Sequence, residues 1–188
     1  MKHRSGMAAS PHAAPPIEPE QTPTMTRTRR SYESGHKAKY LVVIDDSEEC
    51  DRAVYYATRR AARTGAGIVM LRVIELADKN QQWLGVADIM RAEAHEEANA
   101  AIDRAAARAN AAAGLSPERV IREGQLTQEI LTLIEADEDI ATLILAAGTG
   151  SDGPGPLVTN LGKTAGQFPI PVALVPGHLT DAEIDALA

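Results

Sequence analysis

The residues from Leu143 to Lys163 read Leu-Ile-Leu-Ala-Ala-Gly-Thr-Gly-Ser-Asp-Gly-Pro-Gly-Pro-Leu-Val-Thr-Asn-Leu-Gly-Lys. An apolar run of strand length leads into a loop with four glycines, and a short helix can begin only after Pro156. Glycine lets backbone N–H groups approach an anion closely, and a helix N-terminus adds about half a positive charge. The pattern is typical of a phosphate-binding loop, with a plain surface turn as the alternative.

The loop contains the dinucleotide pattern G-x-G-x-x-G at Gly148, Gly150 and Gly153. A dinucleotide site needs this loop after the first strand of the fold, with an acidic residue about 20 positions later for the ribose. Here the loop comes late, and the next strand ends at Pro176-Gly177 without an acid. A dinucleotide site is therefore disfavoured.

The segment Gly162-Lys163-Thr164 is similar to the end of a P-loop, whose lysine reaches the terminal phosphates. Leu157 stands where the first glycine of that motif would be, and too few residues follow for a P-loop domain. A turn of helix with an exposed Lys163 explains the segment better.

Composition predicts a soluble single domain. The chain has 188 residues, of which 44% are hydrophobic and 24% charged, and it lacks an apolar run long enough to span a bilayer. The only cysteine, Cys50, fits a reducing cytoplasm. It lies on the apolar face of an expected helix, which favours a core position over a catalytic one.

Charge is unevenly distributed. Residues 1–39 hold seven Lys/Arg and three Asp/Glu, so the remainder holds 19 − 7 = 12 basic and 26 − 3 = 23 acidic residues. The net charge is therefore +4 for the first part and −11 for the second. An acidic domain with 3% aromatic residues is a poor ligand for nucleic acid, so we expect neither nucleic acid nor membrane as a partner.

Both ends of the chain read as tails. Residues 1–37 contain scattered prolines and arginines without hydrophobic periodicity, which predicts disorder. Met25 is an alternative start, and the basic cluster at Arg27, Arg29 and Arg30 can contact an acidic partner or the acidic domain itself. Residues 178–188 form a C-terminal tail, in which a capping signal at Thr180 predicts a last helical turn.

Between the tails, apolar runs of strand length alternate with amphipathic segments of helical period. We expect strands at 39–45, 68–74, 118–123, 142–146 and 171–175, and helices from 46 to 64, 86 to 113 and 157 to 166, with Asp46 and Ser47 as caps of the first helix. A further helix is expected to begin at its cap Thr127 and to close in the acidic run 135–139. This alternation predicts a parallel sheet with right-handed crossovers. Ligands bind such sheets between two strands whose connections leave in opposite directions, here the first and the fourth. Asp45, Asp46 and Ser47 would then face the glycine loop.

Several segments together resemble the universal stress protein family. They are Asp45 with Ser47 two residues later, the segment Leu71-Arg72-Val73-Ile74, the segment 120–124, the glycine loop and the closing run Pro169-Ile170-Pro171-Val172-Ala173-Leu174-Val175. The resemblance covers residues 38–177. It implies an α/β fold with a doubly wound five-stranded parallel sheet of order 3-2-1-4-5, helices on both faces, and a homodimer formed through the last strand, Pro171 to Val175.

The resemblance also implies a nucleotide site in the members that bind ATP, with adenine beside Asp45 and Val73 and phosphates on the glycine loop. The family signature G-x2-G-x9-G-[S/T] is incomplete here: one register leaves eight spacer residues and puts Lys163 in place of the hydroxyl, and the other puts Asn160 in place of the third glycine. Asp152 adds a carboxylate near the expected phosphates, which Lys163 could offset. The candidate site residues are Asp45, Asp46, Ser47, Val73, Gly148, Gly150, Gly153, Gly162 and Lys163.

Two functions follow from these observations. The first is a cytoplasmic stress-response module that dimerises and binds an adenine nucleotide, ATP, without turnover. The second is a protein-interaction module that binds no nucleotide and whose glycine loop is only structural. We expect no enzyme and no metal, because the five histidines lie in the tail, on a polar helix face or beyond the last strand, without a nucleophile–base pair.

Overall fold

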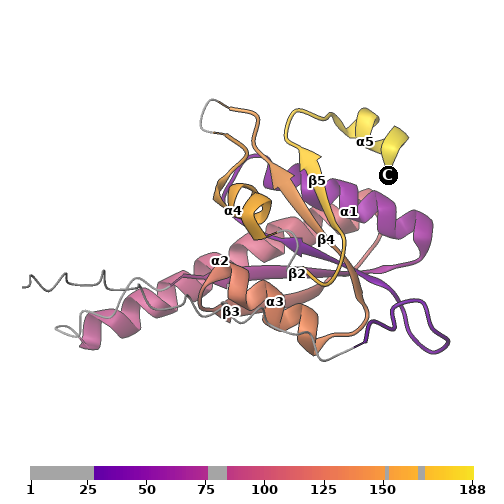
Figure 1. Cartoon of the computed structure of the whole chain (residues 1–188). Helices are drawn as coiled ribbons and strands as arrows, with labels where there is room; N and C mark the ends of the chain where they lie inside the picture. Colours follow the sequence, from indigo (N-terminus) through magenta and orange to yellow (C-terminus); the bar gives the residue numbers. More distant parts are fainter. Residues whose placement is uncertain (1–27, 76–83, 151–152, 165–167) are drawn as a thin grey trace, which may run out of the picture.

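Five parallel strands form one sheet in the order β3-β2-β1-β4-β5 in the computed structural model, which describes residues 28–75, 84–150, 153–164 and 168–188 (Figure 1). The strands are β1 (Lys39–Val43), β2 (Gly67–Ile74), β3 (Glu118–Glu123), β4 (Ile140–Ala147) and β5 (Val172–Pro176). The predicted parallel sheet and its strand order are confirmed, including the adjacency of the first and fourth strands.

The helices are α1 (Cys50–Thr64), α2 (Leu84–Ala113), α3 (Leu126–Ala136), α4 (Pro156–Thr164) and α5 (Asp181–Leu187). The first two pack on one face of the sheet, and α3 and α4 lie on the other. The long helix α2 extends beyond the sheet, as Figure 1 shows. Within the part of the chain that the structure describes, no helix is long and apolar enough to cross a membrane.

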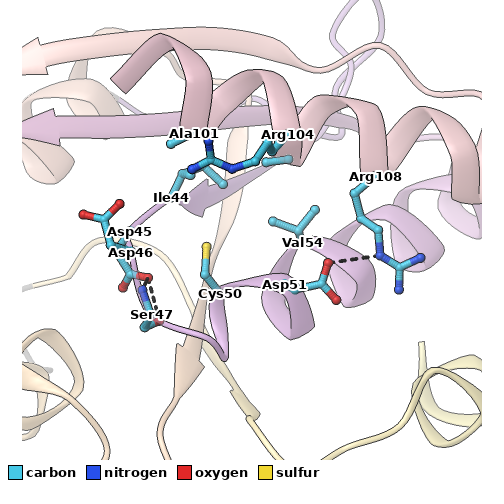
Figure 2. Close-up of a pocket in the computed structure, with 11 residues that line it drawn as sticks. Ile44, Asp45, Asp46, Ser47, Cys50, Asp51, Val54, Ala101, Arg104 and Arg108 are labelled. Atoms are coloured by element: carbon cyan, nitrogen blue, oxygen red, sulfur yellow. Dashed lines mark hydrogen bonds and ion pairs between the residues drawn. The ribbon is translucent and has the colours of Figure 1, made fainter. Parts of the chain in front are cut away.

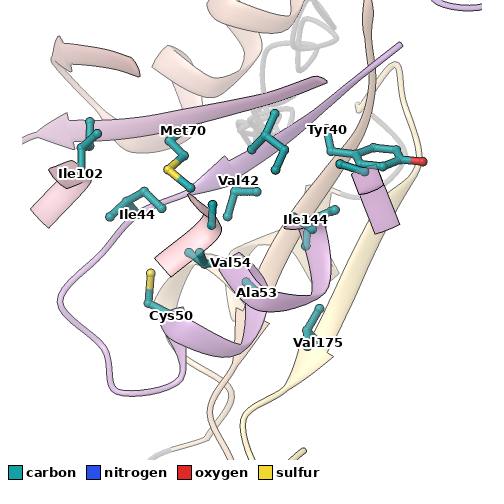
Figure 3. Packing of buried hydrophobic residues seen from close by; sticks show 14 of the residues in the cluster. Tyr40, Val42, Ile44, Cys50, Ala53, Val54, Met70, Ile102, Ile144 and Val175 are labelled. Carbon is teal, nitrogen blue, oxygen red and sulfur yellow. The ribbon is translucent and has the colours of Figure 1, made fainter. Parts of the chain in front are cut away.

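Alternating strand residues contribute to two hydrophobic cores, one on each face of the sheet. Val42 and Ile44 point toward α1 and α2, while Leu41 and Val43 point toward α3. The core under α1 and α2 is built largely from alanines of the two helices against branched strand residues (Figure 3). Because alanine is small, these helices pack close to the sheet. The size of each helix side chain then decides whether the space between helix and sheet is filled or left as a cavity.

The first helix begins later than the sequence predicts, and neither Asp46 nor Ser47 caps it. Helix α1 begins at Cys50, and its N-cap is Glu49, whose side chain makes no capping hydrogen bond. The Ser47 side chain does not cap the helix, because its hydroxyl and its backbone N–H donate hydrogen bonds to the Asp45 carboxylate. This local turn competes with helix formation at the end of β1.

Residues 28–37, for which the sequence predicts disorder, lie against the connection between α3 and β4. The Arg29 guanidinium donates to the carbonyl oxygens of Ile134 and Asp137 at 2.5 and 2.9 Å, where the end of α3 carries partial negative charge. Ser31 is buried and donates to the Glu138 carbonyl at 3.2 Å. Residues 1–27, with the alternative start at Met25, are outside the described residues.

The helix expected after Thr180 is present as α5. The Thr180 hydroxyl accepts from the Glu183 N–H, and the Glu183 carboxylate accepts from the Thr180 N–H, which together form a capping box. Ile184 is fully buried against Tyr55 of α1. The C-terminal segment is thereby fixed beside α1 (Figure 1).

Candidate functional site

The predicted site lies at the edge where β1 and β4 end. Val43 pairs with Leu71 of β2, so Asp45 follows two residues beyond the last paired position of β1. The Asp45 Oδ1 accepts from the Ser47 hydroxyl at 2.6 Å and from its N–H at 3.1 Å. Asp45 is exposed, and its carboxylate also interacts with the Cys50 thiol.

Asp46 is occupied by an ion pair that the sequence did not predict. The Arg72 guanidinium donates to the Asp46 Oδ2 at 2.5 Å and to the Ile44 carbonyl at 3.2 Å. Only 16% of the Arg72 side chain is exposed, whereas Asp46 is 75% exposed. The pair ties the ends of β1 and β2 together and neutralises one of the two neighbouring carboxylates.

Val73, the predicted neighbour of adenine, belongs to β2. It pairs with Arg122 of β3, and its partly buried side chain packs against the core beneath α3. Val73 and Asp45 therefore end neighbouring strands, as the resemblance implies. Their assignment to a nucleotide remains a prediction.

The glycine loop is folded on itself. The Gly148 N–H donates to the Pro154 carbonyl at 3.3 Å, and the Gly153 N–H donates to the Gly150 carbonyl at 3.2 Å. Gly153 has a φ of 86° and Gly155 a φ of 93°, in the left-handed region that favours glycine. The backbone conformation of the loop therefore explains glycine at 153 and 155 without a ligand. The N–H groups of Gly148 and Gly153 already donate to carbonyl groups of the loop.

Glu49 covers the start of this loop, although the sequence analysis assigns it no role in the site. A Cβ atom on Gly148 would lie 2.7 Å from the Glu49 Oε1 and 3.0 Å from the Gly153 carbonyl oxygen. A Cβ on Gly177, after β5, would lie 2.8 Å from the Glu49 Cβ. The Glu49 side chain thus passes across the ends of β4 and β5 and sets its carboxylate against Gly148.

Two further predicted residues, Gly162 and Lys163, lie in α4. Their side-chain surroundings fall outside what the structure describes, as does Asp152, so the interaction of Lys163 with phosphates or with Asp152 stays a prediction. Within the described ranges, no group of three His, Cys, Asp or Glu side chains is arranged to hold a metal ion.

A cavity of about 410 Å³ opens on the other side of the segment 45–49, between α1 and α2 (Figure 2). Asp45, Asp46 and Ser47 line it, whereas Gly148, Gly150, Gly153 and Val73 do not. The other lining residues are Ile44, Cys50, Asp51, Val54, Ala101, Arg104, Ala105 and Arg108. The structure therefore brings Asp45 to Ser47 together with α2, while the glycine loop lies across Glu49.

Cys50 lies at the floor of this cavity and is 7% exposed, as expected for a core cysteine. Burial raises the pKa of its thiol from 9.0 to about 11. Its Sγ faces the Val43 carbonyl at 3.8 Å. A thiol this strongly protonated is a poor nucleophile, so Cys50 contributes packing to the site.

Arg108 in the cavity wall connects α2 to the C-terminal helix α5. Its Nε donates to Asp51 at 3.0 Å, and its Nη2 donates to both Asp181 carboxylate oxygens at 2.8 and 2.9 Å. Its guanidinium also lies 4.3 Å from the centre of the Tyr55 ring. The two carboxylates hold the pKa of Arg108 above its usual range despite its partial burial.

Sequence reasoning missed Glu49, Arg104 and Arg108. The two arginines are four residues apart in a helix, a spacing that places them on one face and was the available signal. No comparable signal distinguishes Glu49 from its acidic neighbours, because its role depends on how β4 and β5 end beside it.

The model of the Universal stress protein family matches residues 38–176. Among solved structures, the universal stress protein UspA from Lactobacillus plantarum is 19% identical, with a TM-score of 0.62 over 73% of this chain and 97% of that one. A universal stress protein family member from Burkholderia pseudomallei is also 19% identical, with a TM-score of 0.58 over 74% of this chain and 96% of that one.

A third solved structure is a universal stress protein in complex with cAMP, 19% identical, with a TM-score of 0.54 over 73% of this chain and 96% of that one. At these identities the likeness establishes the fold. No curated protein matches the chain.

Proposed function

We propose, on the premise that this chain belongs to the universal stress protein family, that it is a cytoplasmic stress-response module that acts through protein contacts. It pairs with a second copy of itself and carries out no catalytic turnover. The glycine loop is structural in this proposal, and Glu49 keeps nucleotide phosphates away from it.

The position of the Glu49 carboxylate carries this proposal. It lies against Gly148, at the place where a phosphate would approach the loop. Two unit charges about 4 Å apart near a protein surface interact by about 4 kcal/mol, and here the interaction with a phosphate is repulsive. The amides of Gly148 and Gly153, which a phosphate would need as donors, already donate to carbonyl groups of the loop.

Isothermal titration of ATP into wild type and Glu49→Ala tests the role of Glu49. We expect Glu49→Ala to bind ATP at least about tenfold more tightly than wild type, since both the charge and the bulk over Gly148 are removed. Glu48→Ala is the matched control, because Glu48 is an exposed acid in the same segment. Equal affinity of wild type and Glu49→Ala would show that Glu49 does not exclude the nucleotide.

Adenine-nucleotide binding, with ATP as the ligand, is the second candidate. It is favoured by the neighbouring ends of β1 and β4, because open parallel sheets bind ligands where the connections of adjacent strands diverge. One of the similar solved proteins is in complex with cAMP. For this candidate to hold, Glu49 must turn away when the phosphates enter.

Two measurements distinguish this candidate from the first. If it holds, purified wild-type protein releases adenine nucleotide on denaturation, and Asp45→Ala weakens ATP binding by at least about tenfold. Protein that carries no nucleotide, and whose weak ATP affinity is unchanged by Asp45→Ala, excludes it. A steady-state ATP hydrolysis assay with Mg²⁺ tests turnover, since about one event per second would fall within the range of ordinary enzymes.

The proposed contact between copies is through β5. This strand is at the edge of the sheet and pairs with β4 on one side only among the described residues. Its Leu174 side chain is 49% exposed. An edge strand presents unpaired N–H and C=O groups, and here an apolar side chain adjoins them, so a second β5 can both pair with it and cover Leu174.

Light scattering coupled to size exclusion tests the β5 contact. We expect wild type to be a dimer and Leu174→Lys to be a monomer, because a charge at the contact would be buried without a partner. Leu187→Lys is the control, since Leu187 is 62% exposed but lies in α5. A monomeric wild type, or a Leu174→Lys variant that stays dimeric, would exclude this interface.

A further inference from the structure

The cavity between α1 and α2 has an apolar floor. Ile44 from the end of β1 and Val54 from α1 face Ala101 of α2 across it (Figure 2), and Ala105 of the same helix also lines it. The alanines leave the space that larger side chains on the same helix face would fill. At about 410 Å³, the cavity falls in the range of small-molecule sites, roughly 300–1,000 Å³.

Most of the charges around this floor are already paired. Asp51 accepts from Arg108 and from Arg52, and Asp46 accepts from Arg72. These groups form the fixed polar rim of the cavity. A ligand gains little by competing with such intramolecular pairs.

Two lining charges of opposite sign remain. Within the described ranges, Arg104 forms no ion pair, and the Asp45 carboxylate interacts with Ser47 and with the Cys50 thiol but has no cationic partner. Arg104 extends from α2 along one wall, and Asp45 lies on the facing segment after β1, beyond the buried Cys50 (Figure 2). The two side chains do not pair with each other, so a ligand that carries both charges can lie between them.

We propose that this cavity binds a small zwitterion with an apolar body, of the size and kind of a free aromatic or branched-chain amino acid. The ligand carboxylate receives hydrogen bonds from the Arg104 guanidinium, the ligand ammonium donates to the Asp45 carboxylate, and the apolar body covers Val54 and Ala105. Charge-assisted hydrogen bonds of this kind are roughly twice as strong as neutral ones.

The opposite charges make a zwitterion a better ligand than either ion alone. An anion gains Arg104 but meets Asp45 and its acidic neighbours, and a cation gains Asp45 but meets Arg104. A zwitterion satisfies both groups, and it leaves the net charge of −7 unchanged. The proposal does not rest on nucleotide binding, because the glycine loop does not line this cavity.

Three probes of nearly equal shape test the proposal by isothermal titration: L-phenylalanine, 3-phenylpropionate, which lacks the ammonium, and 2-phenylethylamine, which lacks the carboxylate. We expect L-phenylalanine to bind in a saturable 1:1 manner, at least about tenfold more tightly than either analogue. An analogue that binds as tightly as L-phenylalanine, or no saturable binding of L-phenylalanine, overturns the proposal.

Variants then locate the binding. We expect Arg104→Gln to weaken L-phenylalanine at least about tenfold, and to bind 2-phenylethylamine at least as tightly as wild type because the repulsion by Arg104 is gone. We expect Asp45→Asn likewise to weaken L-phenylalanine, and to bind 3-phenylpropionate at least as tightly as wild type because the repulsion by Asp45 is gone. Arg60→Gln, at an exposed arginine of α1 that does not line the cavity, is the charge control. Loss of all three probes together in Arg104→Gln would contradict the assigned contacts.

A second pair of variants tests the cavity by volume instead of charge. Ala105→Leu fills the space and is expected to abolish L-phenylalanine binding, while Ala107→Leu, at an exposed position of the same helix, leaves it intact. Thermal unfolding of each variant confirms that it folds. ATP binding that persists in Ala105→Leu would separate this site from a nucleotide site, and L-phenylalanine binding that persists there would overturn the proposal.

Discussion

The segment from Asp45 to Glu49 separates two regions of unequal packing. On the side of β4 and β5, the Glu49 side chain fills the space over Gly148 and Gly177. On the side of α2, Ala101 and Ala105 leave a cavity of about 410 Å³. The glycine loop, where the sequence predicts a ligand, is thus on the closed side. The cavity is on the open side, which the glycine pattern does not mark. A motif shows where a backbone can receive a ligand, but the neighbouring side chains decide whether it does.

The open side is braced by the C-terminal helix. Asp181 of α5 accepts hydrogen bonds from Arg52 of α1 at 2.7 Å and from Arg108 of α2, so one carboxylate links both walls of the cavity region. These hydrogen bonds hold the pKa of Asp181 below its usual range, and the hydrogen bond from Arg108 has the largest effect. The cavity therefore lies between helices whose spacing is fixed, which distinguishes it from a loose surface crevice.

The largest effect is expected at the apolar anchor of this brace. Ile184 is fully buried, and Ile184→Ala should destabilise the docked α5 by about 2–5 kcal/mol, because it removes buried methyl groups and leaves a cavity. Hydrogen exchange of the α5 amides measures this loss directly. Leu187→Ala, at an exposed position of α5, is the control and should leave the exchange of the helix unchanged. Unaltered protection in Ile184→Ala would mean that Ile184 does not hold α5 in place.

Adding atoms on the two sides should change the free energy of unfolding by unequal amounts. A Cβ on Gly177 would lie 2.8 Å from the Glu49 Cβ and 3.2 Å from the Ala147 carbonyl oxygen, so we expect Gly177→Ala to lower the free energy of unfolding by about 1–3 kcal/mol. Ala105→Leu adds more atoms on the open side and should change it by less than about 0.5 kcal/mol. Urea unfolding measures both, and equal losses would show that the two sides are packed alike.

The sheet could be predicted from the sequence because its signals are local. Buried parallel strands read as apolar runs, and Leu143 to Ala147 or Leu41 to Val43 need no knowledge of the rest of the chain. Turn glycines and the cap at Thr180 are also local. The adjacency of β1 and β4 was expected as the point where the connections of an open parallel sheet diverge, and the strand order was implied by the resemblance to the universal stress protein family. This adjacency is what allowed Asp45 and the glycine loop to be assigned to one edge.

The remaining features depend on contacts between distant segments. Glu49 closes the loop only because β5 ends at Gly177, and Arg72 binds Asp46 from the neighbouring strand. Arg29 contacts the end of α3, more than 100 residues away, through backbone carbonyls that no sequence pattern marks. Such pairings are decided by side-chain reach in the folded chain, which explains why the cap positions and the cavity were not predicted.

The buried thiol beneath the open side should produce an alkaline loss of stability. The pKa of Cys50 is raised to about 11, so folding favours the neutral thiol. This contribution is fully present below the unfolded pKa near 9.0 and is lost as the pH rises toward 11, at no more than about 1.4 kcal/mol per pH unit.

We therefore expect the free energy of unfolding of wild type to fall between pH 9 and 10 by about 1 kcal/mol more than that of Cys50→Ala. Urea unfolding of both proteins across this range gives the difference, because the other groups that titrate there are common to both proteins. Parallel pH profiles would indicate that solvent reaches the thiol through the cavity.

Apart from the nearly neutral Ala105→Leu, the smallest effect is expected for the ion pair between Asp46 and Arg72, where the two sides meet. Asp46 is 75% exposed, so its pair with Arg72 is screened by water, and Asp46→Asn should lower the free energy of unfolding by less than about 1 kcal/mol. Because the Arg72 guanidinium keeps its hydrogen bond to the Ile44 carbonyl, the arginine is not left without a partner. The effect should shrink further in about 1 M salt, where the Debye length is about 3 Å. A loss of more than about 1 kcal/mol in the free energy of unfolding that persists in high salt would mean that the pair is needed to hold the ends of β1 and β2 together. The open side would then depend on this ion pair, as the closed side depends on Glu49.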